Sequence, residues 1–113
     1  MRDGGYEPVA RADDIVEGEP WRFELAGHPD PVRVLVASGG HLYALSGICP
    51  HEQAELGEGF VEDGVLWCPL HSSGFDCSTG EVVNPPCRDA LLTYPVVVSD
   101  GSVHVAVRPA GDR

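Results

Sequence analysis

Lysine is absent from this 113-residue chain, methionine occurs once, and no apolar run is long enough to cross a bilayer. The first residues, MRDGGYEPVARADD, also lack the apolar stretch of a secretory signal peptide. We therefore expect no membrane association and a cytoplasmic location. A chain of this length holds one folded unit, so we predict a single domain over residues 1–113.

Basic residues are scarce: all seven are arginine, against 18 acidic residues, and the formal net charge is −11. A phosphate backbone attracts clusters of positive charge, so this balance argues against nucleic acid and anionic membranes as partners. It favours protein partners that present basic docking faces. The same acidity could instead only keep a small protein in solution, and charge alone does not separate these two interpretations.

Short β-branched or alternating runs, separated by turn signals, dominate the chain and predict an all-β fold. Strands at this spacing are typical of an antiparallel sandwich or barrel. Residues 12–20, ADDIVEGEP, are predicted to hold one helical turn that Asp13 or Asp14 caps and Gly18 ends. The expected strands are WRFELA, VRVLVAS, HLYALS, VLW, EVV, YPVVVS and SVHVAV, with turns that include EDG at 62–64 and SDG at 99–101.

The segment from about residue 46 to residue 86 differs from the rest of the chain. It is rich in glycine, proline, cysteine and histidine, and it carries little strand pattern. We interpret it as a subdomain of two loops that is inserted into the β framework and carries the functional site. In a reducing cytosol its cysteines are more often metal ligands or free thiols than disulfides.

Two cysteine–histidine pairs stand in this segment: Cys49 with His51 and, after sixteen intervening residues, Cys68 with His71. Two thiolates and two imidazoles make a four-ligand metal set, for which zinc is the first candidate. The order differs from that of the familiar zinc finger, in which both cysteines precede both histidines. One cysteine and one histidine per loop suits a binuclear cluster in which one iron takes the cysteines and the other takes the histidines.

The pattern C-P-H, sixteen residues, C-P-L-H resembles the ligand signature of Rieske [2Fe–2S] proteins, where two histidines replace two cysteines on one iron. The sequence YALSGICPHEQAELGEGFVEDGVLWCPLHSSGFDCSTGEVVNPP is similar to the cluster-binding segment of that family throughout. The stretch ADDIVEGE and the C-terminal strand runs also resemble the small soluble Rieske ferredoxins. The resemblance implies the Rieske fold over nearly the whole chain.

The resemblance also implies one Rieske-type [2Fe–2S] cluster per chain. Cys49 and Cys68 would bind its inner iron, and His51 and His71 its outer iron. The sequence NPP at 84–86 occupies the position of the proline-rich loop that covers the cluster in this family.

A one-electron carrier rather than an enzyme is what the resemblance implies for function. Such a ferredoxin serves dioxygenase systems of aromatic hydrocarbon catabolism, between a flavin-dependent NAD(P)H reductase and a terminal Rieske oxygenase. An alternative is a small Rieske subunit of a reductase such as assimilatory nitrite reductase, and a zinc-binding interaction module is the non-redox alternative. The chain is too short for an oxygenase catalytic subunit, which needs a second domain with a His/carboxylate iron site.

The residues after His71 bear on the reduction potential. In high-potential members of the family, a serine and a tyrosine at these positions donate hydrogen bonds to sulfur and so raise the potential. Here the two positions hold Ser73 and Phe75. We therefore expect a potential that is low within the Rieske range of about −150 to +300 mV. The remaining thiols, Cys77 and Cys87, are predicted to be buried or idle rather than paired.

Two further sets of residues have two interpretations each. One set of glycines either lets backbone N–H groups approach the cluster sulfides or forms ordinary turns: Gly47, Gly57, Gly59 and Gly74. One set of acidic residues forms either a docking collar around the site or a solvated loop: Glu52, Glu55, Glu58, Glu62 and Asp63.

Overall fold

The computed structural model describes residues 5–25, 30–50, 53–70 and 73–110, and these residues confirm an all-β fold. Among them, no helix has the length and apolar character of a membrane-spanning segment. The two helices of the described residues are single 3₁₀ turns, η1 (Ala12–Asp14) and η2 (Leu56–Glu58). The strands are β1 (Tyr6–Arg11), β2 (Trp21–Glu24), β3 (Val32–Ser38), β4 (His41–Ser46), β5 (Phe60–Glu62), β6 (Val65–Trp67), β7 (Gly74–Asp76), β8 (Val82–Asn84), β9 (Thr93–Tyr94), β10 (Val96–Ser99) and β11 (Ser102–Ala106).

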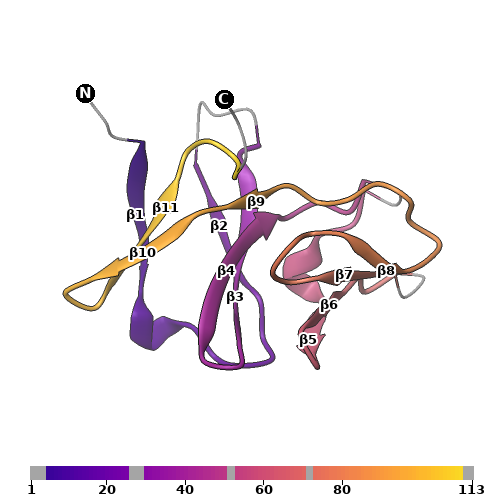
Figure 1. Cartoon of the computed structure of the whole chain (residues 1–113), viewed down its shortest axis with the longest axis horizontal. Coiled ribbons are helices and arrows are strands. Elements are labelled where there is room, and N and C mark those ends of the chain that lie inside the picture. Colours follow the sequence, from indigo (N-terminus) through magenta and orange to yellow (C-terminus); the bar gives the residue numbers. More distant parts are fainter. Residues whose placement is uncertain (1–4, 26–29, 51–52, 71–72, 111–113) are drawn as a thin grey trace.

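Three antiparallel sheets follow one another along the length of the molecule (Figure 1). The first has the strand order β1-β11-β10, the second β2-β3-β4-β9, and the third β5-β6-β7-β8. The first two sheets form a base, and the third carries the chain around the predicted ligands. The expected antiparallel sandwich with an inserted subdomain is confirmed.

The middle sheet has an apolar core on each of its faces. Side chains alternate between the faces of a strand, so the continuous apolar run of β3 supplies both cores. Val34 and Val36, both fully buried, pack with the residues of the third sheet. Leu35 between them is also fully buried, and it packs with Val103 and Val105 of the first sheet.

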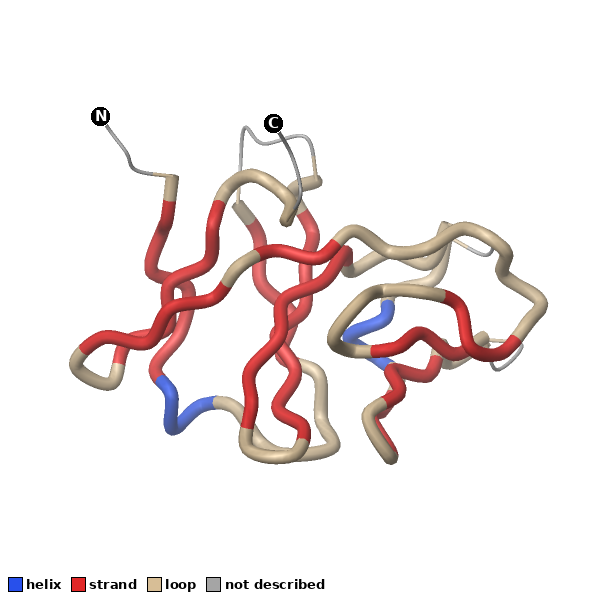
Figure 2. Tube along the Cα trace, in the orientation of Figure 1, coloured by secondary structure: helices blue, strands red, loops and turns tan. Residues whose placement is uncertain are grey.

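The third sheet is formed by the segment that leaves the middle sheet after β4 and returns to it at β9. β4 pairs with β9, in the register Ala44↔Tyr94 and Leu45↔Thr93, although most of the predicted insertion separates them in sequence. The Ser46 N–H donates to the carbonyl of Leu92 at 3.0 Å, so the two ends of this segment are joined where it leaves the middle sheet. In Figure 2 the region that holds the third sheet is mostly loop, with short strands in red. Three-residue strands carry too little periodicity for the sequence pattern to reveal all four of them.

Tight hairpins confirm the predicted EDG and SDG turns. Asp63 and Gly64 have φ values of 55° and 77°, and Asp100 and Gly101 have 52° and 77°. Two successive residues with positive φ define the turn type that matches the twist of the flanking strands, and Asp-Gly is a preferred pair for it. The turns therefore set the registers of β5 with β6 and of β10 with β11.

The predicted helical turn is shorter than expected and is capped differently. Only Ala12–Asp14 are helical, and the chain is extended again at Ile15. The Asp14 carboxylate lies inside the turn and accepts the backbone N–H of Arg11 at 3.0 Å. The prediction that Gly18 ends the helix is wrong, because Val16 and Glu19 form a β-bridge around that glycine.

The sequence pattern did not predict β1, β5 or β7. β1 contains Pro8, which lowers its apparent strand propensity, but it is an edge strand whose pairing has an irregularity between Pro8 and Ala10. β7 reads Gly-Phe-Asp, with two poor strand formers in three residues. Hydrogen bonding to neighbouring strands overrides these weak local preferences.

Candidate metal centre

The two loops that begin at the predicted cysteine ligands are closed in the same way. The N–H of Cys49 donates to the carbonyl of Ala54 at 2.8 Å, and the N–H of Cys68 donates to the carbonyl of Ser73, also at 2.8 Å. Each hydrogen bond therefore joins a cysteine to the residue five positions later. The predicted ligands His51 and His71 belong to these loops but lie outside the described residues. The repeated closure gives the sequence repeat C-P-H and C-P-L-H a structural counterpart.

Regular structure holds both cysteines in place. Cys49 follows a β-bridge between Ile48 and Glu55, and Cys68 comes directly after β6. The two side chains are 0% and 3% exposed and belong to one buried cluster. Pro50 and Pro69, which follow them, are exposed. Each loop therefore leaves the protein interior at its cysteine.

The donor chemistry of these two residues fits an iron–sulfur cluster. Neither cysteine is in a disulfide, so each is able to supply a thiolate. A thiolate buried among apolar side chains is costly unless a cation compensates its charge, and a metal does so. Their backbone N–H groups already donate to backbone carbonyls of the protein, so a metal would be held through the sulfurs.

Ser73 connects the second loop to the segment that follows NPP. Its Oγ accepts the N–H of Cys87 at 3.0 Å, and its carbonyl accepts the N–H of Cys68. The residue is fully buried. Within the described part of the chain, no acceptor receives the proton of its hydroxyl. Ser73 is thus placed to hold two segments together while keeping one hydrogen to donate.

Phe75 contributes a ring without a hydroxyl to the same interior. It lies on β7, is fully buried, and belongs to the cluster of side chains that includes Cys49 and Cys68. Its position agrees with the sequence argument that one hydrogen bond to sulfur is missing here. The low reduction potential itself stays a prediction.

Replacing Phe75 with tyrosine is expected to raise the midpoint potential by tens of millivolts. A hydrogen bond to sulfur stabilises the more negative reduced state, but only the difference between the two redox states moves the potential. A redox titration followed by visible absorbance measures the shift. The control is Tyr94→Phe, which removes a hydroxyl that donates to Asp30 in the base. An unchanged or lowered potential in Phe75→Tyr would refute the missing-hydrogen-bond argument.

The glycines of this segment are used for packing between protein groups. A Cβ on Gly59 would lie 1.9 Å from the carbonyl oxygen of Trp67, and one on Gly74 would lie 2.9 Å from the Trp67 ring. The N–H groups of Gly47 and Gly59 donate to the carbonyls of Val32 and Leu56. The N–H groups of these two glycines are therefore used within the protein, and whether other N–H groups of the segment approach sulfide stays a prediction. Close approach of backbone and ring explains Gly59 and Gly74.

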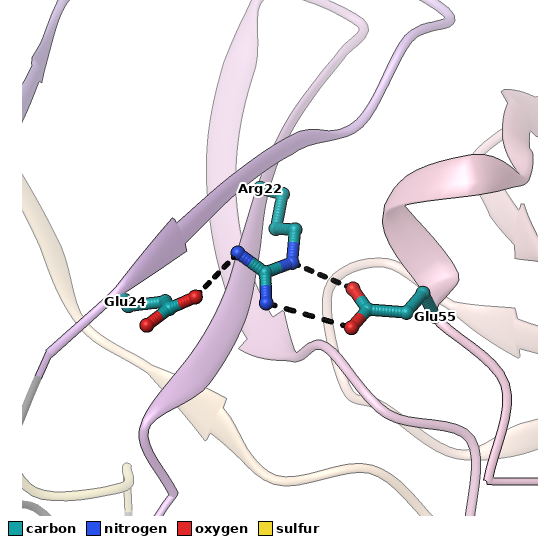
Figure 3. Close-up of polar contacts among 3 residues, drawn as sticks. All are labelled: Arg22, Glu24 and Glu55. Carbon is teal, nitrogen blue, oxygen red and sulfur yellow. Dashed lines mark hydrogen bonds and ion pairs between the residues drawn. The ribbon is translucent and has the colours of Figure 1, made fainter.

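One of the acidic residues between the loops has a partner that the sequence did not suggest. Nε and Nη2 of Arg22 donate to the Glu55 carboxylate at 2.6 and 3.4 Å. Nη1 of the same arginine donates to the Glu24 carboxylate at 2.7 Å (Figure 3). These contacts raise the pKa of Arg22 further above its usual value. The arginine thereby links β2 of the base to the end of the first loop.

This ion pair shows that one carboxylate of the predicted acidic collar is used within the molecule. Glu55 is engaged within the molecule, whereas Glu58, Glu62 and Asp63 are exposed. Glu52 lies outside the described residues. Arg22 and Glu55 are far apart in sequence, so no local pattern could have revealed their contact.

The other two thiols are buried, as predicted. Cys77 and Cys87 are 1% and 2% exposed, and both are free. Burial raises the pKa of Cys77 to about 11, so this thiol is protonated at neutral pH. The Cys87 Sγ donates to the carbonyl of Asp89 at 3.4 Å. Both residues act as small apolar side chains in the core.

Comparison with known proteins identifies the family. The model of the Rieske [2Fe–2S] domain matches residues 5–95. The chain therefore belongs to the Rieske [2Fe–2S] domain family, and its cofactor is one Rieske-type cluster.

Several similar proteins and structures are ferredoxins of dioxygenase systems. The chain is 38% identical over 99 residues to the 3-phenylpropionate/cinnamic acid dioxygenase ferredoxin subunit of Escherichia coli (strain K12), with 87% of each chain covered. It superposes on the ferredoxin of carbazole 1,9a-dioxygenase from Nocardioides aromaticivorans IC177 with a TM-score of 0.82 and 31% identity, covering 91% of this chain and 98% of that one. A chain of the complex of reduced oxygenase and oxidised ferredoxin in carbazole 1,9a-dioxygenase gives a TM-score of 0.87 at 28% identity, covering 97% and 100%.

Proposed function

We propose that this chain is a one-electron carrier that takes electrons from a flavin-dependent NAD(P)H reductase and delivers them to a terminal Rieske oxygenase. Cys49, Cys68, His51 and His71 hold its cluster, the first two on one iron and the last two on the other. In this proposal, residues 1–113 form one Rieske domain, and residues from about 46 to 86 form its cluster-binding subdomain. It places the protein in the cytoplasm.

The matched closure of the two cysteine loops carries this proposal. The same 2.8 Å hydrogen bond, from Cys49 to Ala54 and from Cys68 to Ser73, positions two cysteines that belong to one buried group of side chains and are in no disulfide. The similar ferredoxin subunits and the complex of a similar chain with an oxygenase support the choice of partner. A [2Fe–2S] cluster bound there would take up and release one electron at a time.

The rest of the chain contributes rigidity and a defined surface around the site. Ser73 and the Arg22–Glu55 ion pair fix the two loops to neighbouring segments. A rigid ligand frame lowers the reorganisation that accompanies a change of charge. Pro50 and Pro69, which directly follow the two cysteines, are exposed, so a partner protein is able to approach the loops at these residues.

A single-turnover measurement tests the proposed function. The reduced protein is mixed anaerobically with the terminal oxygenase encoded nearest its gene, and absorbance follows the oxidation of the carrier. We expect one electron to leave per chain, and the flavin reductase with NAD(P)H to restore the reduced state. If neither this oxygenase nor those of the 3-phenylpropionate and carbazole systems accepts an electron, the proposed function is wrong.

Reduction by the flavin reductase is expected to slow as salt increases. The chain has a formal charge of −11, and salt screens its attraction to a basic face once the Debye length is about 8 Å. Glu58→Gln, in the segment between the loops, should flatten this salt dependence. The control Asp13→Asn makes the same charge change on η1 in the base. Stopped-flow rates over a salt series measure both, and equal slopes in the two variants would show that Glu58 is only a solvated residue.

A further inference from the structure

Arg88 is an exposed cation beside the first predicted ligand loop of this acidic chain. It is exposed, and among the described residues it lines an open hollow with Pro50, Pro86 and Asp89. Pro50 stands between the predicted ligands Cys49 and His51. Pro86 ends the NPP sequence. The hollow is therefore lined by the first ligand loop and by the segment after β8. This segment lies at the end of the molecule away from β1 (Figure 1).

The Arg88 guanidinium has no partner in the described part of the chain. Arg22 pairs with Glu24 and Glu55, and the buried Arg33 donates three hydrogen bonds. Arg108 also has an interaction. Of the described arginines, Arg88 and Arg11 are left with no hydrogen bond or ion pair of the side chain to another described residue. Asp89 lines the same hollow and still does not pair with Arg88.

We propose that Arg88 binds a carboxylate of the terminal oxygenase, which enters the hollow between Pro50 and Pro86. This inference rests on the proposed function and names the contact that the carrier uses for delivery. A guanidinium presents a planar fork of N–H donors that matches a carboxylate. The two prolines lose little conformational freedom on binding, so they form a rigid wall beside the charge.

The oxygenase is the partner that the comparisons favour for this contact. A similar chain, which this one covers over its full length, forms a complex with an oxygenase. The acidic remainder of the surface suits a basic reductase, whereas an exposed guanidinium requires an acidic group on its partner. The two half-reactions would thus use different charges of the carrier. This difference allows them to be separated by experiment.

The experiment measures both half-reactions of Arg88→Gln with the cluster-loaded protein. The second-order rate constant for electron transfer to the oxygenase should fall by about fivefold at low ionic strength, the size expected for one exposed ion pair. Reduction by the reductase should not slow, and the midpoint potential should stay the same. Arg88→Lys should recover part of the rate, because it restores the charge without the fork.

Arg11→Gln is the matched control, because it removes the same charge from an exposed arginine on β1, at the other end of the molecule. Equal rates of transfer to the oxygenase in Arg88→Gln and Arg11→Gln would overturn the inference. So would a loss in Arg88→Gln that appears in the reductase step, or one that a changed midpoint potential accounts for. The wild-type protein tests the proposed function separately: if it transfers no electron to any oxygenase, that function fails before Arg88 is considered.

Discussion

Substitution of a predicted ligand should abolish the Rieske spectrum. In the proposed ligand set, His51→Ala removes one of the two imidazoles of one iron, and Cys49→Ala removes a buried thiolate from the other iron. We expect purified variants to lack the visible and reduced EPR signals of the wild type, with iron and sulfide content reduced accordingly. His71→Cys should likewise lose the Rieske signal, even where a cluster with three cysteine ligands assembles.

The other two cysteines provide the control for this prediction. Cys77 and Cys87 are equally buried, but the proposed ligand set does not include them. Cys77→Ala and Cys87→Ala should keep the full spectrum while losing some stability from the smaller side chain. A wild-type spectrum in His51→Ala, or a lost spectrum in Cys77→Ala, would contradict the ligand assignment.

Arg33→Met should be the most destabilising change in the base. The Arg33 side chain is fully buried on β3, and it donates to the carbonyls of Asp30, Ala106 and Val107 at 2.8, 2.8 and 2.9 Å. Its guanidinium lies 3.7 Å from the centre of the Tyr94 ring. Methionine fills a similar volume but leaves these carbonyls without their donors. We expect the free energy of unfolding to fall by about 3–5 kcal/mol.

Urea denaturation of the cluster-loaded protein, followed by circular dichroism, measures this loss. Arg22→Met removes an exposed arginine with two ion pairs and should cost much less, because solvent screens those pairs. Arg33→Lys, which keeps one charged donor, should fall between wild type and Arg33→Met and preserves the comparison if the methionine variant does not fold. Equal midpoints for Arg33→Met and Arg22→Met would show that the buried network contributes little.

The sequence predicted those parts of the fold that local pattern determines. The strand VRVLVAS, which is β3, and the Asp-Gly turns at 63–64 and 100–101 appear as expected, because β-branched runs and positive φ each leave a direct mark on the sequence. The three-residue strands β5 and β7 leave no such mark, and pairing with neighbours alone makes them strands. Both predicted ends of η1 were wrong, because η1 begins at Ala12, before the predicted caps Asp13 and Asp14, and ends at Asp14, before Gly18.

The candidate site was predictable in its residue types but not in its supporting contacts. The spacing of Cys49 and Cys68 is visible in the sequence, and both lie where loops leave one buried cluster. The hydrogen bond from Cys87 to Ser73 and the ion pair of Arg22 with Glu55 join residues that are distant in sequence. Such contacts depend on how β2, the loops and the segment after NPP come together, so only the three-dimensional structure reveals them.

The most direct test of the central claim is a redox titration followed by EPR, with the histidines labelled with ¹⁵N. Addition of one electron per chain should produce a single Rieske-type signal with a low average g-value, coupled to two histidine nitrogens, and His51→Ala and His71→Ala should not produce this signal. A colourless protein that binds zinc, or a reduced signal with no histidine nitrogen coupling, would contradict the account.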